Sequence, residues 1–300
     1  MHATLFALMQ YSDKQKQTAK ELLLLFDNDV DACQKALPLI FANQISDEIV
    51  KNKKQRSRKF GDTVISVVDV VKTYKLGRQH VTALNRVSIQ IKSGEFVAIA
   101  GTSGSGKSTL LHLMGGLDKP SSGDIIIDEQ NIAHMSDKQL SIFRNRTTGF
   151  IFQFFYLQPF LTLQQNITVP AMFARKKTKQ RTERGKFLAD TVGLADRSNH
   201  LPRELSGGQM QRAAIARALQ NNPKILFADE PTGNLDRANA VAIFELFEKI
   251  RNDQGTTIVV VTHDKELASM ADRVITVSDG VITNSDKFKG SVIIPKGGKK

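Results

Sequence analysis

The chain has 300 residues, of which 41% are hydrophobic and 24% are charged, and its formal net charge is +12. This composition supports a packed core and excludes wholesale disorder. The single cysteine, Cys33, excludes a disulfide framework and a cysteine-based zinc site, and it fits a reducing cytosol. The longest unbroken apolar run, Leu22 to Phe26, is far too short to cross a bilayer.

Residues 1–62 differ in character from the rest of the chain. The composition of Asp13 to Phe26 is helical, and a second helix is predicted to begin at Asp31 and to bend or end at Pro38. We therefore expect a small helical N-terminal extension. The basic run from residue 51 to 59 is a solvated connector or, alternatively, a contact for acidic lipid or a partner.

The segment from residue 63 to 284 alternates between strand and helix patterns. Strands are predicted at Val64–Val71, in the turn-and-strand segment Asp118–Asp128, and at Gly149–Gln153, Lys224–Ala228 and Thr256–Thr262, with Val81–Ile91 as a strand pair and Arg273–Val277 with Gly280–Thr283 as a closing hairpin. Between about residues 154 and 222 the pattern is helical, and Ala238–Arg251 is an amphipathic helix. This alternation indicates an α/β fold with a mostly parallel sheet.

A glycine-rich loop lies between the apolar strand Phe96–Ala100 and the helical run Leu110–Met114. Its residues are Gly101, Thr102, Ser103, Gly104, Ser105, Gly106, Lys107, Ser108 and Thr109. Glycines allow a tight wrap that aims backbone N–H groups at a phosphate, and the helix start adds its positive dipole end. Lys107 is suited to the β- and γ-phosphates, and the Ser108 hydroxyl is suited to Mg²⁺.

The apolar strand at Lys224–Ala228 ends in two carboxylates, Asp229 and Glu230. At a strand end beside the phosphate loop, Asp229 can hold Mg²⁺ directly or through water. Glu230 can then orient and deprotonate an attacking water. The alternative is a strand that merely ends in acidic residues.

A second anion site is predicted at Leu205–Gln209, where two glycines follow a serine at a helix start. The chain has one phosphate loop but two anion-binding helix starts. We therefore expect two copies to pair head to tail, so that each offers its second site to the ATP of the other.

Together these motifs resemble the nucleotide-binding subunit of an ATP-binding-cassette (ABC) transporter over roughly residues 64–283. The resemblance implies that Tyr74 stacks on adenine, that Gln153 touches Mg²⁺ and reports to a membrane partner, and that His263 lies near the γ-phosphate. It also implies the Walker A role for the glycine-rich loop and the Walker B role for the two carboxylates. In addition, it implies that the signature Ser206, Gly207, Gly208 and Gln209 acts across the dimer and that the D-loop 233–236, with Asp236, contributes to the nucleotide site.

The residues around these motifs resemble those of the branch that contains lipoprotein-release, macrolide- and peptide-export and cell-division ATPases. This resemblance rests on the segments Phe152–Leu157, Met210–Arg212 and Gly233–Asp236. The implied fold is a P-loop NTPase (RecA-like) core with a mostly parallel sheet, an antiparallel β subdomain and an inserted helical subdomain. The implied domains are an extension with a basic linker at 1–62, an ATPase domain at 63–284 with its helical subdomain at about 154–222, and a basic tail at 285–300.

The resemblance implies an ATPase that dimerises around two ATP–Mg²⁺, as a homodimer or with a similar ATPase. It would drive a separately encoded transmembrane permease from the cytoplasmic face of the inner membrane, as a peripheral protein, with substrate and direction open. A regulatory ATPase of the cell-division type, which signals without transport, is the alternative. A DNA-repair or ribosome-associated relative is less compatible, because those resemble paired cassettes or carry coiled-coil or zinc insertions, so no nucleic-acid partner is expected.

Overall fold

The computed structural model describes residues 60–285. The predicted N-terminal extension up to residue 59 and the basic tail after residue 285 lie outside the described residues. Within residues 60–285, none of the helices combines the length and the apolar character needed to span a bilayer.

A six-stranded sheet forms the centre of the fold. Its strand order is β10 (Val281–Ser285), β9 (Arg273–Ser278), β3 (Phe96–Ala100), β8 (Thr257–Val261), β7 (Ile225–Asp229) and β6 (Thr148–Ile151). All neighbours from β9 to β6 are parallel, and β10 pairs antiparallel with β9. Every residue of β8 is buried, as expected for a continuous apolar strand inside a parallel sheet. The predictions of a mostly parallel sheet and of a closing hairpin are therefore confirmed.

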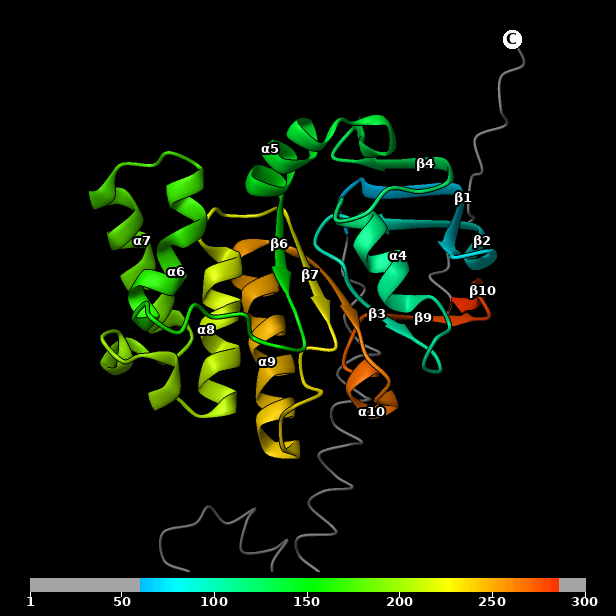
Figure 1. Cartoon of the computed structure of the whole chain (residues 1–300). Helices are drawn as coiled ribbons and strands as arrows, with labels where there is room; N and C mark the ends of the chain where they lie inside the picture. The colour runs from blue at the N-terminus through cyan, green and yellow to red at the C-terminus, as the bar shows by residue number, and fades with distance from the viewer. Residues whose placement is uncertain (1–59, 286–300) are drawn as a thin grey trace, which may run out of the picture. The chain divides into compact units, whose positions relative to one another are not determined.

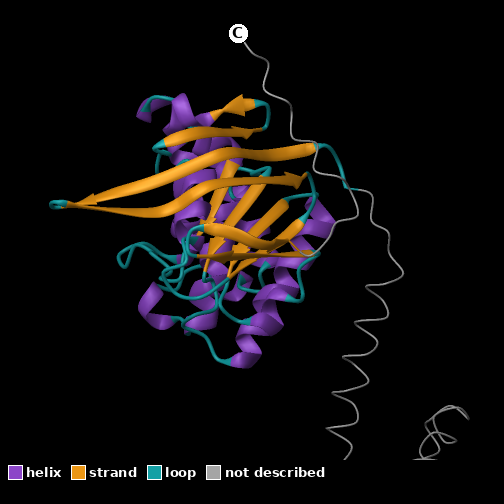
Figure 2. Ribbon diagram, turned by 90° about the vertical axis from the view of Figure 1, so that its right-hand side faces the viewer, coloured by secondary structure: helices purple, strands orange, loops and turns teal. Residues whose placement is uncertain are grey.

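A second, antiparallel sheet has the order β2 (Gln79–Lys92), β1 (Thr63–Leu76), β4 (Ser122–Ile127) and β5 (Gln130–Asn131). The prediction of a strand pair at residues 81–91 is wrong, because this segment is part of one strand, β2, that pairs with β1. Several register shifts interrupt that ladder, and such bulges disturb the alternation from which a single strand is recognised. Figure 2 shows the β1–β2 ribbon extending beyond the other strands.

Helices cover both faces of the six-stranded sheet. On one face, α4 (Lys107–Met114) and α5 (Asp137–Thr147) share a hydrophobic cluster with the antiparallel sheet. On the other face, a second cluster involves α8 (Gly207–Leu219), α9 (Arg237–Gln254) and α10 (Lys265–Ala268). Alternate residues of the same strand enter the two clusters, as Val97 and Ala98 do, because successive side chains of a strand point to opposite faces. Figure 1 shows α4 between the two sheets and α8 beside α9.

The segment predicted to be helical contains α6 (Leu163–Phe173) and α7 (Thr178–Thr191) before α8. These helices pack on one another to the side of the sheet (Figure 1). Gly185 allows the close approach of α7 to α6, since a Cβ there would lie 2.7 Å from the Thr168 methyl group. Short 3₁₀ turns complete the fold at Ile132–His134, Ala195–Arg197 and Pro202–Glu204.

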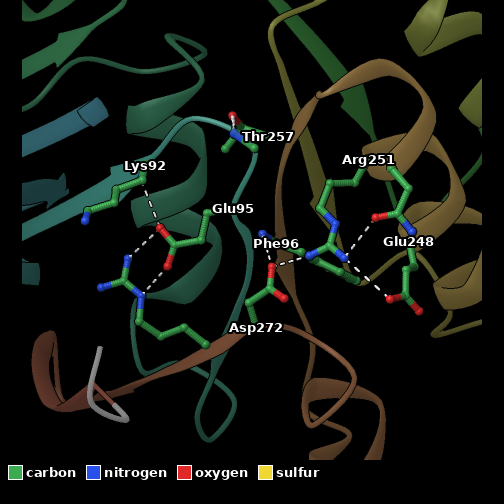
Figure 3. A network of polar contacts seen from close by, with 10 residues as sticks. Lys92, Glu95, Phe96, Glu248, Arg251, Thr257 and Asp272 are labelled. Carbon is green, nitrogen blue, oxygen red and sulfur yellow. Dashed lines mark hydrogen bonds and ion pairs between the residues drawn. The ribbon is translucent and has the colours of Figure 1, made fainter. Parts of the chain in front are cut away.

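A polar network joins the start of β3 to β9 and α9 (Figure 3). Glu95 accepts a hydrogen bond from the Lys92 backbone N–H at 2.9 Å and pairs with Arg273 Nε at 2.7 Å. Asp272 accepts from the Phe96 N–H at 2.9 Å and also pairs with Arg251. Burial raises the pKa of Glu95, and Arg273 opposes that shift. The network fixes the strand that leads into the glycine-rich loop.

Candidate active site

The glycine-rich loop connects β3 to α4 in a conformation that depends on glycine at two positions. Gly106 caps α4 with φ of 102°, in the left-handed region. Gly101 approaches β9 so closely that a Cβ would lie 2.1 Å from the Val277 carbonyl oxygen. A side chain at either position would move the loop, so the strand-to-helix wrap predicted from the sequence is present.

Inside this loop, Lys107 is only 5% exposed and its ammonium donates to the Thr102 carbonyl at 2.6 Å. Within residues 60–285, the Ser105 hydroxyl is buried and has no hydrogen-bond partner. Burial of a charged ammonium costs free energy, and so does burial of a hydroxyl donor that has no partner. An anion bound beside them would offset both costs. The residues of the loop therefore fit a phosphate group.

Asp229, at the end of β7, lies directly beside the loop. The Ser108 hydroxyl donates to Asp229 Oδ1 at 2.8 Å, and His112 Nε2 lies 3.2 Å from Asp229 Oδ2. A hydroxyl and a carboxylate side by side are hard oxygen donors of the kind that Mg²⁺ prefers. Within the described part of the chain no cluster of three His, Cys, Asp or Glu residues forms a metal cage. The pair fits Mg²⁺, which is commonly held by one or two protein groups and by substrate phosphates.

Glu230 follows with a backbone φ of 43°, which non-glycine residues rarely adopt. Its N–H donates to the Val261 carbonyl of β8 at 3.0 Å, so the strained backbone is fixed by the sheet. His263 Nδ1 lies 3.4 Å from Glu230 Oε2, and the histidine side chain is 67% exposed. The structure thus brings the predicted base and the predicted γ-phosphate residue together at the strand ends.

Gln153 follows β6 and contacts the D-loop. Its backbone carbonyl accepts from the Asn234 side chain at 3.1 Å, and a Cβ on Gly233 would lie 2.8 Å from its Nε2. The next residues are held by Arg217 of α8, which donates to the Tyr156 and Phe155 carbonyls at 2.5 and 2.8 Å. Desolvation lowers the pKa of this arginine. We refer to residues 153–157 as the Q-loop.

The signature lies at the start of α8, with Ser206 as the N-cap. The Ser206 hydroxyl accepts from the Gln209 N–H at 3.3 Å, and Gln209 Oε1 accepts from the Ser206 N–H at 2.8 Å. Asp236 caps α9 and accepts from the Asn239 N–H at 2.9 Å, a bond that lowers the pKa of Asp236. Among the described residues, no hydrogen bond or ion pair joins the signature to the glycine-rich loop, and α4 and α8 pack on opposite faces of the sheet. The structure therefore does not bring the signature into the site formed by its own chain.

Tyr74 lies on β1 and not after a strand, because β1 extends beyond the predicted end at Val71. Its hydroxyl donates to Asp118 Oδ2 at 2.9 Å, and the residue is 36% exposed. Burial, followed by the bond to Asp118, raises the pKa of Tyr74. Burial would also raise the pKa of Asp118, but bonds from Lys72, the Lys119 N–H and Tyr74 lower it.

Four residues that contact a predicted site residue or the Q-loop were not assigned a role from the sequence: Lys72, His112, Asp118 and Arg217. His112, Asp118 and Arg217 reach their partners from other elements, so no local pattern marks them. The spacing of Lys72 and Tyr74 was the one available signal, because residues two apart on a strand share a face.

A glycine-rich phosphate loop, a hydroxyl–carboxylate pair and a carboxylate–histidine pair at the ends of parallel strands define the class of P-loop nucleotide hydrolases. The family model described as ABC transporter matches residues 84–233. The chain is 44% identical to the lipoprotein-releasing system ATP-binding protein LolD of Syntrophotalea carbinolica over 74% of this chain and 98% of that protein. It belongs to the ABC transporter family and is an ATPase of that family.

Two further comparisons agree with this assignment. The macrolide export ATP-binding/permease protein MacB of Chlorobaculum tepidum is 44% identical over 78% of this chain, and the match covers 36% of MacB. The dimeric, post-hydrolysis structure of the ATP-binding cassette MJ0796 bound to ADP and Pi is 41% identical, with a TM-score of 0.70 over 76% of this chain and all of that one. The predicted family and fold class are thereby confirmed.

Proposed function

We propose that this ATPase works as a head-to-tail dimer and drives a separate transmembrane permease from the cytoplasmic face of the membrane. Each of the two sites would combine the glycine-rich loop of one copy with the signature of the other. The similarity to LolD and MacB supports export or extraction of a lipoprotein, lipid or peptide as the work performed. The dimeric state of MJ0796 supports the pairing.

Each predicted residue has a defined task in this proposal. Lys107 and the loop amides bind the phosphates, while Ser108, Asp229 and Gln153 hold Mg²⁺. When bound, the metal would neutralise charge that develops on the transferred phosphoryl group. Glu230 accepts a proton from the attacking water, and His263 steadies the γ-phosphate. Tyr74 stacks on the adenine ring.

One observation carries the dimer: the signature forms a helix start, which is a favourable place for an anion, and it lies away from the phosphate loop of its own chain. Ser206 caps α8, so the N–H groups of Gly207 and Gly208 at the first turn are oriented for an external anion. In a dimer with a twofold axis, each phosphate loop would face the signature of the other copy across the bound nucleotide.

The catalytic assignment is tested with Glu230→Gln. The amide cannot take a proton from water, so we expect turnover to fall at least about 100-fold, while ATP binding and ATP-dependent dimerisation persist. Hydrolysis and size-exclusion chromatography with light scattering provide the two measurements. Glu245→Gln, on the exposed side of α9, is the control and should behave as wild type. Normal turnover in Glu230→Gln would refute the assignment of Glu230 as the base. If the variant stays strictly monomeric at saturating ATP with the permease present, the proposed dimer is refuted.

A groove on the helical side of the molecule is our candidate for the permease contact. It lies between α6, the start of α7 and the segment before α6. Phe160, Met172 and Phe173 line it and are 74%, 51% and 78% exposed. Large exposed apolar side chains that gather in one groove are typical of a protein–protein contact. The groove follows the Q-loop in sequence, which offers a short route from the nucleotide site to the permease.

Phe160→Ser and Phe173→Ser should release the permease on co-purification without changing the hydrolysis rate of the isolated ATPase. Phe187→Ser is the matched control, because Phe187 is 55% exposed on α7 but does not line this groove. Retention of the permease by both groove variants would refute the contact. The captured partner also decides between the two functions: a substrate path or lipid cavity supports transport, and a small anchor bound to a wall hydrolase supports signalling.

A further inference from the structure

The ring of Tyr74 is held from two sides by Lys72 and Asp118. One carboxylate oxygen of Asp118 accepts a hydrogen bond from the Tyr74 hydroxyl at 2.9 Å. The other oxygen accepts one from Lys72 Nζ at 2.8 Å. The same ammonium lies over the tyrosine ring, 4.7 Å from its centre. The three side chains form a closed triangle of contacts.

The backbone at this point explains the arrangement. The register of β1 against β2 shifts on both sides of Lys72, and such irregularities re-aim side chains. The loop after α4 is attached to the same stretch of strand, because the Ser121 N–H donates to the Val71 carbonyl at 2.8 Å and the Thr73 N–H donates to Ser121 Oγ at 3.0 Å. The loop therefore brings Asp118 to the tip of β1.

These contacts remove the freedom of the Tyr74 ring. A hydrogen bond at the hydroxyl fixes the ring direction, and the ammonium of Lys72 covers one face. That ammonium also donates to the Lys119 carbonyl at 2.8 Å, and the Lys72 side chain is only 12% exposed, so it has a fixed position. A flat ligand can stack only on the other face, and a ring that is already fixed loses little conformational entropy when the ligand binds.

We propose that Lys72 and Asp118 are positioning residues that fix Tyr74 for stacking on a nucleobase and thereby set the affinity for ATP. The inference rests on the proposed role of Tyr74 as the adenine contact. Asp118 lies in the loop that follows α4, and α4 begins at the phosphate loop. The base contact and the phosphate contact are thus joined by one helix and its following loop.

The test compares ATP with inorganic tripolyphosphate, which carries phosphates but no base, using the full-length protein and Mg²⁺. Asp118→Ala, Lys72→Met and Tyr74→Phe should each raise the Kd for ATP about 3- to 10-fold, the effect of losing one hydrogen bond or cation–π contact. The Kd for tripolyphosphate should stay within about twofold of wild type in all three variants, because none of them changes a residue of the phosphate loop. Tyr74→Phe and Asp118→Ala share the loss of the bond between hydroxyl and carboxylate, so the double variant should raise the Kd for ATP by less than the product of the two single effects.

Asp124→Ala is the matched control, because Asp124 is a hydrogen-bonded carboxylate of the same sheet that contacts Asn131 and His134 instead. It should change neither Kd. Weaker tripolyphosphate binding in the Asp118 or Lys72 variants would show a general effect on the fold and overturn the inference.

Tyr74→Ala separates this inference from the function on which it rests. If that variant binds ATP as wild type does, the adenine assignment fails and the inference fails with it. If Tyr74→Ala weakens ATP binding but Asp118→Ala and Lys72→Met do not, the stacking role stands and the positioning inference alone is overturned.

Discussion

Two arginines on α9 show how the surroundings of a single residue decide what an ion pair contributes. The Arg251 side chain is 4% exposed and pairs with Asp272 (Figure 3), whereas the Arg237 side chain is 52% exposed and pairs with Asp264 at 2.6 Å. An exposed pair gains little because water screens it. A buried pair is different, since water screens it little and removal of Arg251 takes away the positive charge that compensates the Asp272 carboxylate.

We expect Arg251→Ala to lower the free energy of unfolding by about 3–5 kcal/mol. Arg237→Ala, the control on the same helix, should lower it by less than about 1 kcal/mol. Urea unfolding followed by circular dichroism measures both. Equal losses for the two variants would contradict the role of burial.

For single residues, the sequence predicted the position of those side chains that a local pattern marks. The glycine-rich loop and the carboxylates after β7 are of this kind, because strand, loop and helix order alone brings them to the ends of parallel strands. Asp118 and Arg217 could not be predicted in this way. Their contacts, to Tyr74 and to the Q-loop carbonyls, join residues 44 and about 61 positions apart, and a single sequence contains no record of such pairs.

Among the elements, strands buried on both faces were predicted best, because their unbroken apolar runs differ from any other pattern. β8 and β7 were recognised with ends correct within two residues. The ribbon of β1 and β2 was less predictable, since half of the β2 residues are exposed and register shifts break the alternation. That is also why Tyr74 was expected beyond the strand and lies within it.

The junction between α8 and the Q-loop connects the signature helix to the segment beside the nucleotide site. Arg217 holds two successive Q-loop carbonyls, and Tyr156 has φ of 46°, a conformation that costs free energy unless its surroundings fix it. Arg217→Ala should therefore release the Q-loop while the phosphate loop, on the other face of the sheet, still binds ATP.

For Arg217→Ala we expect faster amide hydrogen exchange at residues 154–157 and at least about tenfold lower stimulation of hydrolysis by the permease, since a mobile Q-loop transmits motion poorly. The Kd for ATP should stay within about twofold. Arg203→Ala, an exposed position before the signature, is the control. Unchanged exchange in the Q-loop would show that Arg217 does not hold it.

For the whole molecule, the arrangement of the two proposed anion sites leads to a test that needs no membrane. Lys107→Ala disables the phosphate loop. Gly207→Asp puts a carboxylate at the second anion site, where a Cβ meets nothing closer than 3.6 Å, so that the variant should fold. Each variant alone should fail to dimerise with ATP, because both of its composite sites are defective.

A mixture of the two variants behaves differently if the pairing is head to tail. One site of the mixed dimer then carries both defects, and the other combines an intact loop with an intact signature. Binding of ATP at that site should restore association between differently labelled chains, measured by energy transfer. Hydrolysis should recover up to roughly half of the wild-type rate, since only mixed dimers form and each has one good site out of two. A site built within one chain predicts no recovery, because every chain in the mixture would keep its own defect.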